Sequence, residues 1–187
     1  MTTERLQQYY ELLEMSYDDA VKTLLTDHGA VPGDYFIEKS YNKWVAGENK
    51  LPGKNKNLSR TDEGLEIHQN AEDEYEDMGN PVAIEKQDIP FSLQKADTLC
   101  YVDKWEHTIL HALIAIKTKG QHGLPGFNTY LMPIVKEWYI DEKAPSDSAP
   151  QWYKNSYNAA KLDKKEATEL LTKIVNMLDE ALKDVRF

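Results

Sequence analysis

The stretch that decides the fold covers residues 98–111 and reads Thr-Leu-Cys-Tyr-Val-Asp-Lys-Trp-Glu-His-Thr-Ile-Leu-His. Its first part, Leu99–Val102, is a short apolar run with β-branched and aromatic members, which is typical of one buried strand. Asp103 ends this run, and Glu106 follows three residues later, which is the spacing of a capping box at a helix start. The stretch therefore predicts a strand that leads directly into a helix beginning near Lys104.

Two histidines share one face of this expected helix. His107 and His111 lie four residues apart, so their imidazoles are one turn apart and can bind the same divalent metal ion. The same spacing also fits a half-buried histidine pair without a ligand, and spacing alone leaves both interpretations open. Glu106 is a further candidate ligand, but the capping box favours a bond from its carboxylate to the backbone N–H of Asp103.

The composition describes an acidic chain with enough apolar residues for a core. The 187 residues are 41% apolar and 29% charged, and the formal net charge is −10. Because phosphate binding needs local positive charge, a general nucleic-acid coat protein is excluded. Cys100 is the only cysteine, which excludes an internal disulfide and a cysteine-based zinc site. The sequence has no signal-like or membrane-spanning apolar run, so we expect a cytoplasmic protein without a membrane partner.

Helical patterns occupy both ends of the chain. Apolar residues recur at helical spacing near the N-terminus, where Gly29 is the expected C-cap and His28 complements the helix terminus. The expected segments are a helical scaffold at 1–30, a basic irregular loop at 31–60, a strand–strand–helix unit with a long acidic loop at 61–119, and further helices at 120–187, all within one compact domain.

The C-terminal helix has the clearest apolar stripe. A polar linker at 141–151 precedes it, and Asp163 and Glu166 are its expected capping residues. The stripe can pack on the domain itself or on a partner chain, as in a homodimer, and the sequence does not distinguish the two.

The segment 31–60 is rich in lysine and is punctuated by Pro-Gly and Gly, which predicts an irregular basic loop. Tyr41 and Trp44 are interleaved with the basic residues, and such a mixture can contact a nucleic-acid backbone and stack on bases. An ordinary solvated lysine-rich loop is an equally good interpretation. The residues that would bind nucleic acid are Lys43, Lys50, Lys54, Lys56 and Arg60.

An acidic segment follows. Alternating apolar residues predict a short strand over 64–68 that ends at His68. Residues 62–77 contain eight acidic side chains and no lysine or arginine. The segment lacks the ligand ladder of a calcium loop, so a solvated acidic loop is the default expectation. A surface that binds a basic protein is the alternative.

The order strand, long loop, strand and helix, with His68 ending the first strand and His107 and His111 on the helix, resembles the ββα-metal finger of HNH nucleases. The resemblance covers roughly residues 60–116, and its details are similar to HNH-like proteins of bacterial mobile elements. It implies that the three histidines bind one divalent ion, Mg²⁺, Mn²⁺, Ni²⁺ or Zn²⁺. It also implies an α+β, predominantly α fold, with a small ββα-metal finger embedded among amphipathic helices.

Two positions depart from the family pattern. Gln69 stands where the family has its general-base histidine, and Thr98, nine residues before His107, stands where it has an asparagine. A neutral imidazole accepts the proton of an attacking water near neutral pH, whereas an amide can only orient that water. Asp73 or Glu72 in the long loop could supply a substitute base, although no spacing requires it.

The resemblance implies two functions. The first is an HNH-like metal-dependent endonuclease with an altered base, which holds DNA or RNA through the 39–60 loop. The second is a catalytically inactive binding protein whose 62–77 surface inhibits a basic nucleic-acid enzyme, as in anti-CRISPR or anti-restriction activity of phages and plasmids. Both would act in the cytoplasm of a bacterial host cell. A third interpretation is an unrelated structural protein with coincidental histidines.

Overall fold

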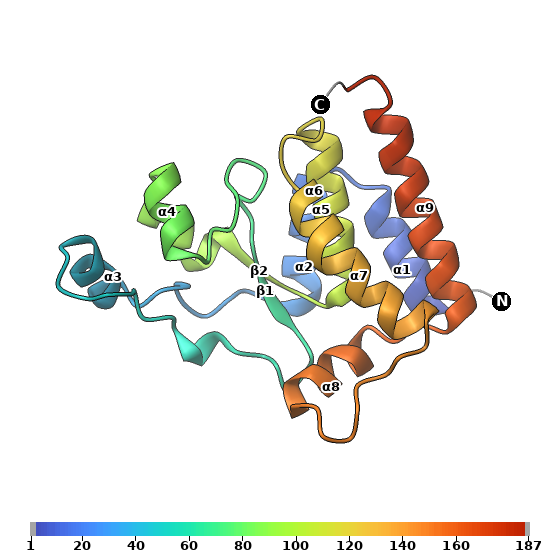
Figure 1. The fold of residues 1–187 in the computed structure, drawn as a ribbon, viewed down its shortest axis with the longest axis horizontal. Helices are drawn as coiled ribbons and strands as arrows, with labels where there is room; N and C mark the ends of the chain where they lie inside the picture. Colours follow the sequence, from blue (N-terminus) through green and yellow to red (C-terminus); the bar gives the residue numbers. More distant parts are fainter. Residues whose placement is uncertain (1–2, 186–187) are drawn as a thin grey trace.

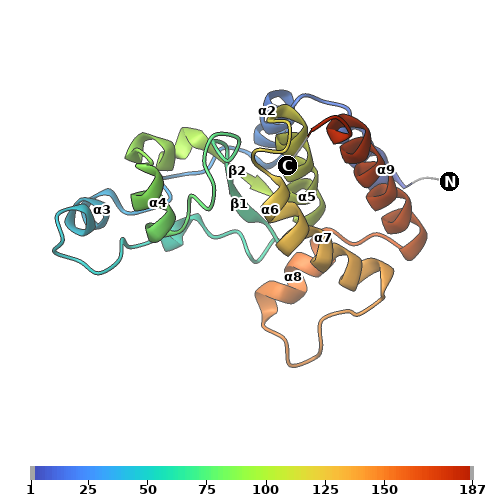
Figure 2. The same cartoon turned by 45° about the horizontal axis from the view of Figure 1, so that its top comes forward.

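The computed structural model describes residues 3–185 and is mainly helical with one small antiparallel sheet, which confirms the expected α+β, predominantly α class. Helices α1, α2, α5 and α9 gather on one side of the sheet, while α3 and α4 lie on the other side (Figures 1 and 2). The elements are α1 (Glu4–Leu13), α2 (Tyr17–His28), α3 (Glu38–Val45), β1 (Glu66–Gln69), α4 (Pro81–Gln87), β2 (Leu99–Val102), α5 (Lys104–Lys117), α6 (Leu124–Gly126), α7 (Met132–Val135), α8 (Gln151–Ala159) and α9 (Lys164–Leu182).

The strand-to-helix transition is as the sequence predicts. β2 is fully buried, and both bonds of the capping box between Asp103 and Glu106 are present at the start of α5. β1 pairs antiparallel with β2, so that His68 lies opposite Cys100. The first strand begins at Glu66, slightly later than expected, because Gly64 has a φ of 79° and lies in a turn.

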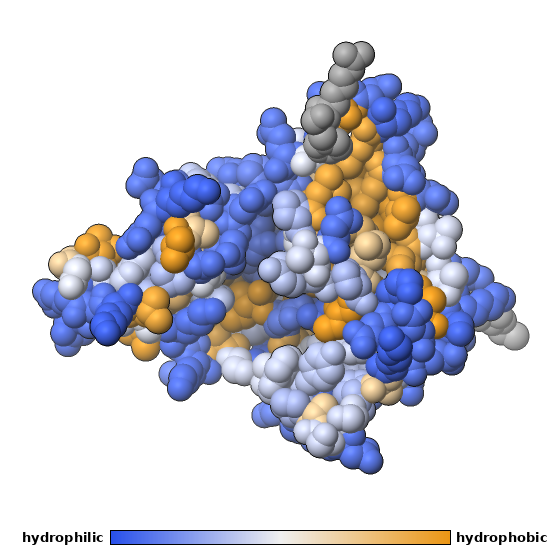
Figure 3. Space-filling model, in the orientation of Figure 1, coloured by the Kyte–Doolittle hydropathy of each residue, from blue (hydrophilic) through white to orange (hydrophobic). Residues whose placement is uncertain are grey.

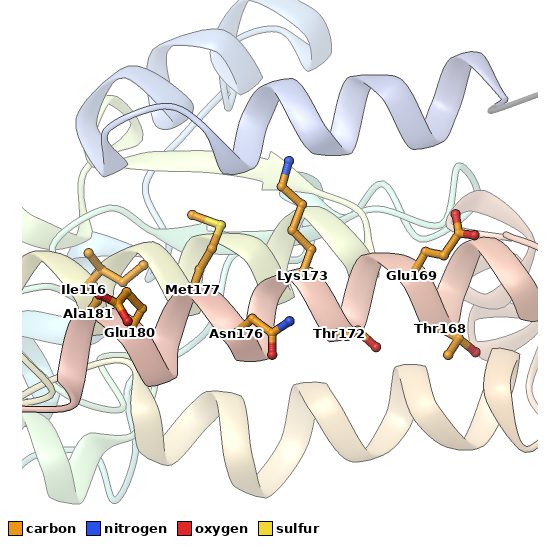
Figure 4. A pocket seen from close by; sticks show the side chains of 9 residues that line it. All are labelled: Ile116, Thr168, Glu169, Thr172, Lys173, Asn176, Met177, Glu180 and Ala181. Carbon is orange, nitrogen blue, oxygen red and sulfur yellow. The ribbon is translucent and has the colours of Figure 1, made fainter.

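The main core forms around α5. It also contains the apolar stripe of the C-terminal helix, which therefore packs on its own domain. The stripe residues Leu170, Ile174 and Leu178 are buried in the chain's own core, where α9 packs on α5 and α1. Figure 3 shows an apolar band on the face between α9 and its neighbouring helices. The exposed side of α9, together with Ile116 of α5, lines a shallow groove whose surface is mostly apolar (Figure 4). A homodimer through this helix would have to use these outer surfaces, and it stays a prediction.

The segment 31–60 is less irregular than expected, because it contains α3. Tyr41 and Trp44 lie on one face of α3 and are buried in a satellite core with Phe36, Met78 and Ile84. With both aromatic rings on one face, α3 is amphipathic, and burial of that face stabilises the helix. It also removes both rings from any base-stacking role, so that part of the prediction is wrong.

Two features of the C-terminal third were not specified by the sequence patterns. Helix α8 follows the linker at Pro150. Pro133 lies within a continuous helical stretch formed by α6, α7 and the turns around them. Widened π turns at 127–131 and 136–140 flank α7. Within residues 3–185, no helix is both long and apolar enough to cross a membrane.

Candidate metal centre

The three histidines that the sequence singles out converge. His68 comes from β1, and His107 and His111 come from the first two turns of α5. The ring centroid of His68 lies 5.2 Å from that of His107 and 5.7 Å from that of His111. The centroids of His107 and His111 are 4.9 Å apart. Glu72 joins them, with one donor atom from each of the four residues within 4.8 Å of all the others. This group can hold a metal ion.

Glu72 is the member that sequence reasoning missed as a ligand. It lies in a turn directly after β1, in which its own N–H donates to the Gln69 carbonyl at 3.0 Å. The turn brings the carboxylate back beneath the strand end, so that Glu72 Oε2 lies 3.9 Å from Nδ1 of His68. The four-residue spacing of His68 and Glu72 was the available signal. It was obscured because Glu72 is one of eight acids in the same segment.

His107 has a defined tautomer. Its Nδ1 lies 2.6 Å from Oε1 of Glu66, whose two oxygens also each accept from Nζ of Lys104 at 2.8 Å. Burial opposes ionisation of Glu66, but the attraction of His107 and Lys104 prevails and lowers its pKa to about 2. An ionised carboxylate only accepts, so Nδ1 of His107 carries a proton. Nε2 of His107 is buried and has no hydrogen-bond partner.

His111 faces acceptors with both nitrogens. Its Nδ1 lies 3.2 Å from the Gly123 carbonyl oxygen, and its Nε2 lies 3.0 Å from Oε2 of Glu72. Gly126 packs so closely against this ring that a Cβ there would collide with it. Because a carbonyl only accepts, Nδ1 is the protonated nitrogen, and a neutral His111 directs a lone pair at a carboxylate. That arrangement requires a shared cation, either a second proton on the ring or a metal ion.

His68 and Glu72 complete the electrostatics. His68 is 0% exposed, and burial lowers its pKa to about 3, so its imidazole is neutral near pH 7. Its Nε2 lies 2.8 Å from the Tyr17 hydroxyl, whereas its Nδ1 is buried without a partner. For Glu72, burial opposes ionisation, but the bond to His111 prevails and lowers the carboxyl pKa to about 2. Two imidazole nitrogens without partners lie beside one carboxylate, and a cation bound between them would satisfy all three.

The centre opens onto a cavity of about 590 Å³. Glu72, His107 and His111 line it, together with Lys104 and Gln69, while the fully buried His68 lies behind them. Three imidazole nitrogens and a carboxylate oxygen are a donor set suited to a divalent transition metal. The open side gives a small molecule or a phosphate group access to an ion held there.

Gln69 and Thr98, at the two altered positions, have structural partners. Gln69 is 4% exposed, and its Nε2 donates to Oε1 of Gln94 at 2.7 Å, while Nε2 of Gln94 donates to the Met78 carbonyl at 2.9 Å. The Thr98 hydroxyl donates to the Lys95 carbonyl at 2.8 Å, and its own carbonyl accepts from Asn70 at 2.8 Å. Gln69 thus borders the cavity in a fixed orientation, and Thr98 braces the base of the long loop.

The five basic residues expected to bind nucleic acid do not form one group. Lys43, Lys50, Lys54 and Lys56 are exposed, and Nζ of Lys54 lies 5.2 Å from the ring centroid of Tyr35, which lines the cavity. Arg60 instead pairs with Glu63, bonds to the His28 carbonyl and covers the Tyr101 ring. Arg60 is therefore committed to the fold, and nucleic-acid binding by the lysines stays a prediction.

No protein-family model, curated protein or solved structure matches this chain. The resemblance to HNH nucleases therefore rests on its residues and on the order of its elements.

Proposed function

We propose that the protein is an HNH-like metal-dependent endonuclease that cleaves phosphodiester bonds of DNA or RNA, with an altered catalytic base. The observation that carries the proposal is the convergence of three imidazoles and Glu72 at the junction of β1 and α5, beside an open cavity. A divalent cation held by His68, His107, His111 and Glu72 would supply charge that polarises the scissile phosphate and stabilises the leaving oxygen.

The donor set narrows the choice of metal. Mg²⁺ prefers oxygen ligands and keeps several waters, whereas imidazole nitrogens suit Zn²⁺ and Ni²⁺. With His68, His107 and His111 supplying three nitrogens and Glu72 one oxygen, we infer Zn²⁺ or Ni²⁺ first, then Mn²⁺, and Mg²⁺ last. The fixed Nδ1–H of His107 and of His111 supports this order, because each ring is already oriented by a bond on its far side.

The altered base limits the expected rate. Since Gln94 donates to the Met78 carbonyl, its Oε1 is the end that accepts from Gln69. Gln69 therefore keeps its own Oε1 and one side-chain N–H to orient a water, and it cannot take a proton from that water at neutral pH. Loss of general-base help typically lowers a rate by about 10²- to 10⁴-fold.

A nicking assay tests the proposal. Supercoiled plasmid and single-stranded RNA are incubated with Zn²⁺, Ni²⁺, Mn²⁺ or Mg²⁺ and with the protein or its His111→Ala variant. We expect slow, metal-dependent cutting that the substitution abolishes. The Gln69→His variant should cut about 10²- to 10⁴-fold faster, because Oε1 of Gln94 would accept a ring N–H and leave the other nitrogen free as the base. Cutting that survives His111→Ala would contradict the proposal.

A second candidate is the inactive binding protein that inhibits a basic nucleic-acid enzyme. Two observations favour it: Gln69 is tied to Gln94, and the exposed acids Glu76 and Asp77 stand at the cavity rim. This candidate predicts no cutting with any metal, even after Gln69→His, and inhibition of a basic nuclease that depends on residues 62–77. Either function would be exercised in the cytoplasm of a bacterial host cell.

A further inference from the structure

A tyrosine from outside the ββα unit contacts the metal centre from behind. Tyr17 lies in the first turn of α2, is 4% exposed, and stands edge-on to His68. Its hydroxyl oxygen lies 2.8 Å from Nε2 of His68 and 2.9 Å from the Asn70 carbonyl oxygen. It is the contact partner of His68 on the side away from the other ligands.

The proton count at this hydroxyl determines which nitrogen of His68 is protonated. The hydroxyl has one proton, and the Asn70 carbonyl can only accept, so Tyr17 donates to Asn70. Its oxygen then accepts a proton from Nε2 of His68. A phenol hydroxyl keeps its proton at neutral pH. Nδ1 of His68 is left with a lone pair, and it is the nitrogen that faces Glu72.

We propose that Tyr17 is a positioning residue of the metal centre, which holds His68 in the Nε2–H form so that Nδ1 can bind a divalent cation. The inference rests on the metal centre of the proposed function, but not on cleavage. Without the hydroxyl, a proton on Nε2 of His68 would be a buried donor without an acceptor. The imidazole has an alternative, which is to carry its proton on Nδ1 and direct it at Glu72. A proton there occupies the position of the metal.

The same helix also supports the turn that carries Glu72. Nζ of Lys117 lies 2.8 Å from Asp18 of α2 and 2.7 Å from Asp73, the neighbour of Glu72. The Lys117 ammonium lies 5.3 Å from the centroid of the Tyr17 ring. The first turn of α2 therefore contacts His68 directly, and it contacts the turn that carries Glu72 through the Lys117 ammonium.

The test compares Tyr17→Phe with Tyr9→Phe. Tyr9 is a matched control because it is also buried and its hydroxyl donates to Asp103 at 2.6 Å without contacting an imidazole. Zinc affinity is measured by competition with a chelator, and the protonated nitrogen of each histidine is identified by ¹⁵N NMR of the metal-free protein. We expect Tyr17→Phe to bind Zn²⁺ about 10- to 100-fold more weakly and to move the His68 proton to Nδ1. Tyr9→Phe should change neither.

The wild-type spectrum is informative even if Tyr17→Phe fails to fold. A proton on Nδ1 of His68 in the metal-free wild-type protein would overturn the inference, as would unchanged zinc affinity in a folded Tyr17→Phe variant. The outcome is separable from the nuclease assay. Weaker zinc binding in Tyr17→Phe, together with no cutting by any variant, supports the role of Tyr17 and counts against the endonuclease.

Discussion

Two groupings of histidine and carboxylate lie on the first two turns of α5, and they are built differently. In the first, His28 at the end of α2 bonds to Glu106 at 2.8 Å, while Glu106 also closes the capping box with Asp103. In the second, His68, His107, His111 and Glu72 converge. Within residues 3–185, the first grouping has no buried polar atom without a partner, whereas the second has two, on His68 and His107.

The difference separates a structural ion pair from a ligand site. His28 lies at the end of α2, and its Nε2 bonds to Glu106 at the start of α5, so this ion pair joins two helix ends. In the second grouping, nitrogen lone pairs converge on a carboxylate, and they outnumber the protons that could lie between them. Such an arrangement is unfavourable in a buried site unless a cation is bound. The convergence of nitrogens without partners, rather than the number of histidines, distinguishes the candidate metal centre.

The largest effect should come from removing one histidine from each of the two groupings. His111→Ala is expected to abolish stoichiometric zinc binding, because it removes one of four converging donors. His28→Ala should leave zinc binding unchanged. Metal content after gel filtration with excess Zn²⁺ measures both. Equal loss of zinc in the two variants would contradict the difference between the two groupings.

Zinc should also stabilise the fold. A ligand that binds only the native state at about 100 times its Kd adds about 2.7 kcal/mol to the free energy of unfolding. We expect this gain in urea denaturation of the wild type and of His28→Ala, and its reversal by a chelator. His111→Ala should show no gain, and a gain of the same size in that variant would place the zinc elsewhere.

A smaller effect is expected from the residue that orients His107. Glu66→Gln removes the negative charge that accepts from Nδ1, so zinc affinity should fall by about 10- to 100-fold. Glu63→Gln is the control, because Glu63 pairs with Arg60 on the same stretch of chain and contacts no ligand. Chelator competition measures both affinities. Equal affinities in the two variants would show that Glu66 only holds Lys104.

The smallest effect concerns the pH dependence of the structural pair. The hydrogen bond to Glu106 raises the pKa of His28, against burial and the charge of Arg60, and Asp103 adds to the rise. A raised pKa in the folded state gives stability that is fully present below about pH 6.5 and is lost as the pH rises through the folded value. The wild type should therefore exceed His28→Gln in unfolding free energy by more at about pH 5.5 than at about pH 9, in metal-free buffer. A constant difference would mean that the bond does not depend on charge.

Local patterns were sufficient for the framework of the site. The apolar run of β2, the capping box at Asp103 and the four-residue spacing of His107 and His111 depend on neighbours along the chain, and all three are present in the structure. The resemblance added His68 from a distant strand, and its ring does meet the other two. Helix α3 and the burial of Tyr41 and Trp44 were not predicted, since their partners Met78 and Ile84 come from a later segment.

By itself, the sequence determined a predominantly helical α+β chain and three histidines at the spacings of a metal finger. Only the tertiary structure shows that Glu72, one of eight acids in its segment, lies with the histidines. It also places Glu66 against His107 and Tyr17 against His68. The reason is physical. Periodicity and capping are short-range properties of a chain, whereas ligand geometry and proton positions depend on which donors and acceptors distant segments bring within about 3 Å of each other.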